Sequence, residues 1–122
     1  MKKIVLLYNF DDKELPILKR AIMPLHFGIK VIVGDDIYLP VGYLAGITDN
    51  SEKRVCSGEI SGKLVVMGGF GNSDIDKLIL AMRKAGFGRE VLKAVITPVN
   101  SEWCGAELYN EVNKEHEMLS KK

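Results

Sequence analysis

Runs of consecutive apolar residues recur four times along the chain, separated by longer segments of mixed character. Each run is predominantly apolar rather than alternating between apolar and polar residues, so each predicts a strand that is buried on both faces. Strands of this kind are typical of mostly parallel sheets that carry helices on both sides. The four predicted strands cover residues 3–8, 29–33, 63–67 and 93–96.

Between these runs, apolar residues recur at the spacing of amphipathic helices. One helix begins after Asp11 or Asp12, either of which can cap it. A second runs from Ser73 to Ala85, and a third runs from about Gly105 to Leu119. Residues 40–46 predict a further short helix, although two glycines weaken it. In the first helix the apolar stripe is formed by Leu15, Leu18, Ile22 and Leu25.

The order of these elements predicts an α/β fold in one domain over residues 1–122. The sheet is expected to be four-stranded and mostly parallel, with strand order 2-1-3-4. Right-handed crossovers would then place the first and last helices on one face and the other two helices on the opposite face. The alternative is a ferredoxin-like βαββαβ sheet with an added C-terminal helix. We find no internal repeat in the sequence pattern.

Composition and charge narrow the class of protein. Of 122 residues, 47% are hydrophobic and 27% are charged, and the net charge is +1. The charges are mixed along the chain without a basic block, so we expect no nucleic-acid partner. All apolar runs are much shorter than the roughly 20 residues of a membrane span, and the first is too short for the core of a signal peptide. We therefore predict a cytoplasmic protein without a membrane partner.

The cysteines and histidines indicate no metal site. Cys56 and Cys104 lie far apart and form no CxxC motif, and in a cytoplasmic protein they are expected to be free thiols. Neither they nor His26 and His116 have the spacing of a ligand cluster, so we predict no metal and no cofactor. Because no motif of a hydrolase or a zinc protease is present, we assign no catalytic residue.

Polar residues at the strand ends indicate where a ligand could bind. In open parallel sheets, ligands bind beyond the carboxyl ends of the strands. That edge would bring together Asn9, the turn over residues 68–73, and the pair Thr97 and Asn100. In the ferredoxin-like alternative, Thr97 and Asn100 would lie at the opposite edge from Gly69. The two folds therefore predict incompatible sites.

The glycine-rich turn after the third strand holds Gly69, Gly71 and Ser73, whose backbone N–H groups could bind a phosphate at the start of a helix. The match to a dinucleotide fingerprint fails because Asp74 stands where the third glycine belongs. Asp74 and Asp76 also place negative charge in the first helical turn, where they repel a second anion. Since Ser73 and Asp76 have the spacing of a capping box, a capped helix start is favoured over an anion site.

The segment that follows the fourth strand is the most distinctive local pattern. Pro98 ends the strand because it has no N–H group to donate, and Asn100 or Ser101 can cap the last helix. Trp103 would fasten that helix to the body of the protein, so a structural role is favoured. The functional alternative places the Thr97 hydroxyl and the Asn100 amide beside a ligand, with Trp103 as an apolar wall.

The second half of the chain resembles a family in these same stretches. Gly68-Gly69-Phe70 is followed by Lys93-Ala94-Val95-Ile96-Thr97-Pro98-Val99-Asn100 and by Trp103, which match a Lys-Ala-Val-x-Thr-x-x-Asn-x-x-Trp signature. This pattern is similar to that of a bacterial family of small proteins known only as a domain of unknown function. The resemblance covers roughly Lys63 to Glu117. It implies no activity, because none is assigned to that family.

These observations favour a non-enzymatic binding or regulatory module that recognises a partner protein or a small molecule. The prediction rests on a polar sheet edge and on the lack of a catalytic motif. The alternative is an enzyme or a phosphate- or nucleotide-binding protein that uses the Gly69–Ser73 turn with Thr97 and Asn100. A third hypothesis is a self-associating module, for which a homodimer is the simplest form.

Overall fold

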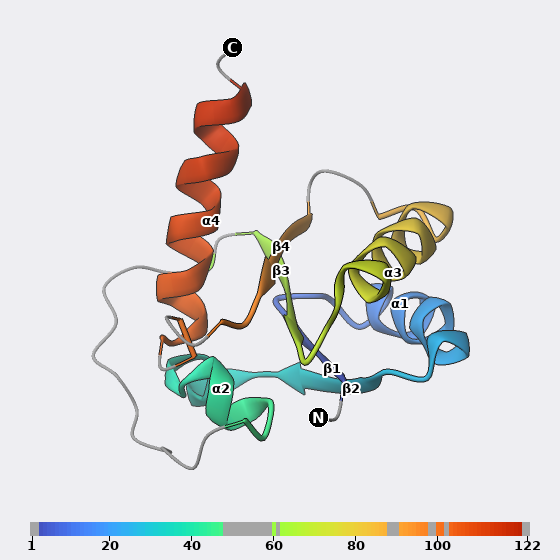
Figure 1. Ribbon diagram of the computed structural model, residues 1–122, viewed down its shortest axis with the longest axis horizontal. Coiled ribbons are helices and arrows are strands. Elements are labelled where there is room, and N and C mark those ends of the chain that lie inside the picture. The colour runs from blue at the N-terminus through green and yellow to red at the C-terminus, as the bar shows by residue number, and fades with distance from the viewer. Residues whose placement is uncertain are drawn as a thin grey trace.

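The computed structural model describes residues 3–47, 60, 62–87, 91–97, 100–101 and 103–120. Its elements confirm the predicted α/β class and the predicted short helix (Figure 1). In chain order they are β1 (Ile4–Tyr8), α1 (Glu14–Ile22), the 3₁₀ turn η1 (Met23–Leu25), β2 (Gly28–Ile32), the 3₁₀ turn η2 (Gly34–Tyr38), α2 (Val41–Leu44), β3 (Lys63–Gly68), α3 (Asn72–Lys84), β4 (Val91–Val95) and α4 (Gly105–Ser120).

The strands form one sheet in the predicted order β2-β1-β3-β4. The sheet is mostly parallel, since β1 pairs with β2 and β3 with β4 in parallel. The central pair, β1 with β3, is antiparallel, with Ile4 opposite Gly68 and Tyr8 opposite Leu64. The carboxyl ends of β1 and β2 therefore lie at one edge of the sheet, and those of β3 and β4 lie at the opposite edge.

The helices cover both faces of the sheet, but not in the predicted combination. Helices α1 and α3 pack on one face, and α2 and α4 pack on the other (Figure 1). Because β3 runs opposite to β1, a crossover of the same hand brings α3 back to the face that α1 covers. The buried side chains on that face are Val5, Leu7, Leu18, Ile22, Phe27, Val65, Met67, Leu78, Met82, Phe87 and Val91.

The β1–α1 segment and the β3–α3 segment are two copies of one structural unit, so the expectation of no internal repeat is wrong. Residue n of the first copy corresponds to residue n + 60 of the second, from Lys3 and Lys63 to Phe27 and Phe87. Buried apolar residues occupy the same positions in both copies, but only some of them are identical, which conceals the repeat in the sequence. Buried counterparts include Val5 and Val65, Leu7 and Met67, Leu18 and Leu78, and Ile22 and Met82.

The backbone of the two copies repeats in detail. Asn9 has a left-handed φ of 66°, and its counterpart Gly69 has a φ of 75°. Later in each unit, His26 has a φ of 63° and Gly86 a φ of 96°. Left-handed conformations at both pairs of counterparts mean that the same turns end the strand and the helix in each unit.

Each of these contacts between the two units has a counterpart in which the units swap roles. The Lys3 Nζ atom lies 3.0 Å from Asp74 Oδ1, and the counterpart Lys63 pairs with Glu14. The rings of Phe10 and Phe87 have centroids 5.9 Å apart, and those of Phe27 and Phe70 have centroids 4.4 Å apart. Each unit therefore supplies a lysine and aromatic rings that complete the other. The two units are related by a half turn about an axis perpendicular to the sheet.

Candidate ligand-binding site

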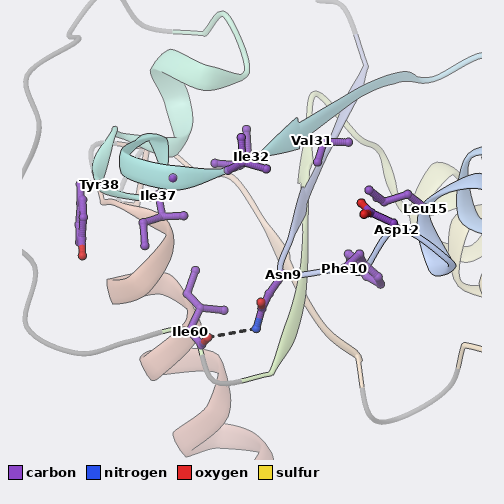
Figure 2. A pocket seen from close by; sticks show the side chains of 11 residues that line it. Asn9, Phe10, Asp12, Leu15, Val31, Ile32, Ile37, Tyr38 and Ile60 are labelled. Carbon is purple, nitrogen blue, oxygen red and sulfur yellow. Dashed lines mark hydrogen bonds between the residues drawn. The ribbon is translucent and has the colours of Figure 1, made fainter.

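A pocket of about 560 Å³ opens at the carboxyl ends of β1 and β2, between the start of α1 and η2 (Figure 2). This is the end of a parallel strand pair, where ligands bind in α/β sheets, and its volume lies within the range of small-molecule sites. The lining residues are Asn9, Phe10, Asp12, Leu15, Val31, Ile32, Val33, Gly34, Ile37, Tyr38 and Ile60.

Asn9 forms the floor of this pocket. Asparagine is one of the few residues other than glycine that adopts a positive φ readily, and here it directly follows β1. Its Nδ2 group donates to the carbonyl oxygens of Ile60 (3.1 Å) and Gly62 (3.0 Å). These bonds fix the amide, as Figure 2 shows for Ile60. Its Oδ1 atom accepts no hydrogen bond from the described residues.

The acids at the start of α1 have separate roles. The Asp11 Oδ1 atom accepts hydrogen bonds from the backbone N–H groups of Glu14 (2.8 Å) and Lys13 (2.9 Å), so the Asp11 side chain satisfies two donors at the start of α1. These bonds, the one from Glu14 first, hold the pKa of Asp11 below its ordinary value. The neighbouring Asp12 lies beside Leu15 at one end of the pocket (Figure 2), and its carboxylate has no partner among the described residues.

Apolar side chains make the upper wall and the other end of the pocket. Val31 and Ile32 come from the last residues of β2, and Ile37 and Tyr38 come from η2 (Figure 2). The Tyr38 hydroxyl makes no hydrogen bond with the described residues. The turn between β2 and η2 uses Gly34 with a φ of 59°. The pocket is therefore amphipathic, with polar groups at its floor and ends.

The predicted site residues separate into two groups. Asn9 lies in the pocket, whereas the antiparallel central pair places Gly69, Gly71, Ser73, Thr97 and Asn100 at the opposite sheet edge. The common edge expected from a parallel sheet is therefore not formed. Trp103 belongs to neither group, because it packs partly buried on the α2 and α4 face. It lines a groove of about 420 Å³ along α4 with Glu107, Asn110, Glu111, Asn113 and Lys114.

The glycine turn before α3 is occupied by a carboxylate of its own helix. The Gly71 N–H group donates to Asp74 Oδ2 at 2.9 Å. This bond first, and the Lys3 ammonium second, hold the pKa of Asp74 below its ordinary value. Because α3 begins at Asn72, the capping acid is Asp74 rather than the predicted Asp76. The Asp74 carboxylate thus takes the place that a phosphate would need.

The turn that follows β4 satisfies its own polar groups. Asn100 Oδ1 accepts from the Thr97 N–H group (2.8 Å), and the Asn100 N–H group donates to Thr97 Oγ1 (3.2 Å). The Asn100 Nδ2 group donates to the Val95 carbonyl oxygen (3.1 Å). Asn100 therefore holds the turn together and does not cap α4, which begins at Gly105.

The same segment fastens α2. The backbone N–H groups of Val41 and Gly42 have no partner within their own helix. They donate to the carbonyl oxygens of Trp103 (2.8 Å) and Ser101 (2.7 Å). Residues of the predicted signature therefore join α2 to the connection between β4 and α4. The role is structural, as the sequence favours, but these bonds hold α2, whereas the sequence predicts a cap and a fastening for the last helix.

Burial raises the pKa of the Tyr8 hydroxyl above its ordinary value, and the Asp36 carboxylate adds a smaller effect.

Cys104 is disulfide-bonded, so the prediction of a free thiol is wrong for this residue. Cys56 lies outside the described residues. Since disulfides are typical of oxidising compartments, Cys104 gives no support to the predicted cytoplasmic location. That location stays a prediction.

Comparison with known proteins confirms the family resemblance. The family model of a domain of unknown function, DUF3783, matches residues 63–119, which is β3, α3, β4 and nearly all of α4. The match leaves out the first unit. No curated protein and no solved structure matches the chain.

The described residues contain no group of three or more histidine, cysteine or acidic side chains placed to hold a metal ion. No helix within the described ranges has both the length and the apolar character needed to cross a membrane.

Proposed function

We propose that this protein is a non-enzymatic binding module that holds a small molecule in the pocket at the carboxyl ends of β1 and β2. The observation that carries the proposal is a difference between the two edges of the sheet, each at the carboxyl ends of a parallel strand pair. At the β3–β4 edge, the turn after β4 uses the amide of Asn100 internally. At the β1–β2 edge, Asn9 Oδ1, the Asp12 carboxylate and the Tyr38 hydroxyl are open around an apolar pocket.

The chemistry of the lining supports binding rather than catalysis. Its polar groups are an amide, a carboxylate and a phenol, which can orient a ligand by hydrogen bonds. Nucleophilic catalysis would need a hydroxyl, thiol or amine held beside a base. The apolar side chains would bury the body of a ligand, as small-molecule sites do.

The proposal is tested by two-dimensional NMR of the full ¹⁵N-labelled chain with a library of small fragments. We expect bound fragments to shift resonances of Asn9, Asp12 and residues 31–38. Val33 lines the pocket and is 66% exposed, so Val33→Trp should block the pocket without disturbing the core. Ile17→Trp is the matched control, because Ile17 is 52% exposed on α1 and lies outside this lining.

The outcome that would contradict the proposal is equally specific. In one such outcome, fragments bind at other residues only; in the other, they bind Val33→Trp as well as the unmodified protein. Either result would exclude the pocket as the binding site. The spectrum of each variant also reports whether it is folded, so loss of binding cannot be mistaken for loss of structure.

One observation favours the alternative, a phosphate or nucleotide site. Gly69 and Gly71 follow β3 and Thr97 and Asn100 follow β4, so all four lie at one edge, as that alternative requires. The Asp74 carboxylate opposes it, because it already accepts the Gly71 N–H group. We expect inorganic phosphate and nucleotides to leave the melting temperature unchanged. Stabilisation by a phosphate that Asn100→Ala abolishes would favour the alternative.

A further inference from the structure

We infer that the pocket beside β1 and β2 selects an organic cation with an apolar body, such as an aryl- or alkylammonium compound. This inference rests on the proposed function and adds the chemical class of the ligand. Its first basis is the kind of polar group left open. Asn9 Oδ1 and the Asp12 carboxylate are acceptors without partners among the described residues. A ligand that offers donors, and above all a positive charge, matches them.

The start of α1 would ordinarily favour an anion. Here its donors are already satisfied. The N–H groups of Lys13 and Glu14 donate to Asp11 Oδ1, and that of Leu15 donates to the Asp11 carbonyl oxygen. The Asp11 N–H group donates to Glu14 Oε1 at 3.1 Å. An anionic ligand would therefore meet carboxylates rather than free donors.

The nearby lysine of the second unit is also engaged. Lys63 begins β3 and pairs with Glu14, so its ammonium is neutralised. Among the described residues that line the pocket, the charged side chain is Asp12. The local charge is thus negative and has no built-in counter-ion within the described lining. A cationic ligand would supply that counter-ion.

The negative charge of Asp12 is not repeated in the second unit. Phe10 and Leu15 have the apolar counterparts Phe70 and Ile75, but the counterpart of Asp12 is the neutral Asn72. The negative side chain therefore stands in the unit with the open pocket and not at the equivalent position of the other unit. Aromatic faces of Phe10 and of Tyr38 at the pocket's ends would add attraction for a cation.

The test uses three probes of similar shape and different charge: phenethylamine, 2-phenylethanol and phenylacetate. Each is titrated into the full ¹⁵N-labelled chain, and the dissociation constant is read from pocket resonances. We expect phenethylamine to bind about fivefold tighter than the alcohol, as an exposed ion pair allows, and phenylacetate to bind most weakly. Asp12→Asn should remove the preference for the amine. Asp76→Asn, at an exposed position of α3, should leave it unchanged.

Two outcomes with the unmodified protein would overturn the inference and spare the proposed function. In the first, the alcohol or phenylacetate binds as tightly as the amine. In the second, other fragments shift the pocket resonances and all three probes fail. A third outcome, in which no fragment reaches the pocket, would remove the proposed function together with the inference. An amine preference that persists in Asp12→Asn would also overturn the inference, because its stated cause would be absent.

Discussion

At the scale of single residues, the start of α4 depends on a glycine that faces an aromatic ring. A Cβ atom added at Gly105 would lie 2.5 Å from the Tyr8 ring, which is fully buried under the helix. The Tyr8 ring fills a fixed place in the core, so it has little room to retreat. The helix can approach the sheet this closely because Gly105 has no side chain.

We expect Gly105→Ala to destabilise the protein by about 1–3 kcal/mol, the usual cost of forcing an extra carbon into a packed core. The free energy of unfolding is measured by urea denaturation. Gly71→Ala is the matched control, because its added Cβ would lie 3.6 Å from Asp74 Oδ2, an ordinary contact. Equal effects of the two substitutions would show that the close approach to Tyr8 does not determine the cost.

Asp74 predicts a dependence of stability on pH. Its pKa in the folded state is lowered from 3.8, so the ionised carboxylate stabilises the fold. That stability is fully present above pH 4 or thereabouts and is lost as the pH falls through the folded-state pKa. We therefore expect Asp74→Asn to lose less stability than the unmodified protein between about pH 6 and about pH 3. Asp76→Asn should keep the original slope, and an equally flat slope in that control would contradict the assignment.

At the scale of elements, both edge strands carry a lysine in the middle. Lys30 lies in β2 and is exposed, and Lys93 lies in β4, where its Nζ atom also donates to the Val91 carbonyl oxygen. Charged side chains on edge strands oppose pairing with the edge of another sheet. The homodimer predicted from the sequence stays a prediction, and these lysines weigh against forming it through the strand edges.

Replacing the edge lysine should expose this effect. We expect Lys30→Val to sediment as larger species than the unmodified protein at the same concentration, because the edge of β2 then becomes apolar and β-prone. Lys19→Val changes an exposed lysine on α1 instead and should leave the sedimentation coefficient unchanged. An unchanged sedimentation coefficient for Lys30→Val would mean that another feature keeps the β2 edge from pairing with a second chain.

Element by element, the sequence predicts the type of each segment better than its direction. The four apolar runs, the long helices and the strand order all follow from periodicity and crossover rules. The direction of β3 does not, because a buried strand has the same residue pattern whether its neighbour is parallel or antiparallel. Because β3 is antiparallel to β1, α3 packs on the face opposite to the predicted one. The residues of the expected site lie at two opposite edges of the sheet for the same reason. The pocket residues Val31, Ile37 and Ile60 are ordinary aliphatic residues, so nothing local to them could indicate a site.

At the scale of the whole molecule, the two units complete each other's packing. The ring of Phe87 packs on Phe10, and that of Phe70 packs on Phe27, so each contact crosses between the units. Ala21 and its counterpart Ala81 line one groove between α1 and α3, where small side chains let the helices approach. Both units also share one sheet through the β1–β3 pair.

We expect unfolding to be a single cooperative transition. Phe87→Leu, in the second unit, should lower amide exchange protection in β1 and β3 by the same amount, corresponding to about 1 kcal/mol. Leu80→Ala is the control, since Leu80 is 54% exposed and belongs to neither of the two ring pairs. Loss of protection in β3 alone, or two separate unfolding transitions, would contradict the interdependence of the units.

The exchanged lysine and phenylalanine contacts also bear on how such a sheet could arise. A chain that held one unit alone would leave its lysine, its helix-capping acid and its rings without their partners. It could recover all of them by pairing with a second identical chain around a two-fold axis. The present protein then corresponds to such a symmetric pair joined into one polypeptide. Within one polypeptide the two halves need not have the same sequence. The polar groups at one edge of the sheet could therefore hydrogen-bond to one another, while those at the other edge stayed available to a ligand.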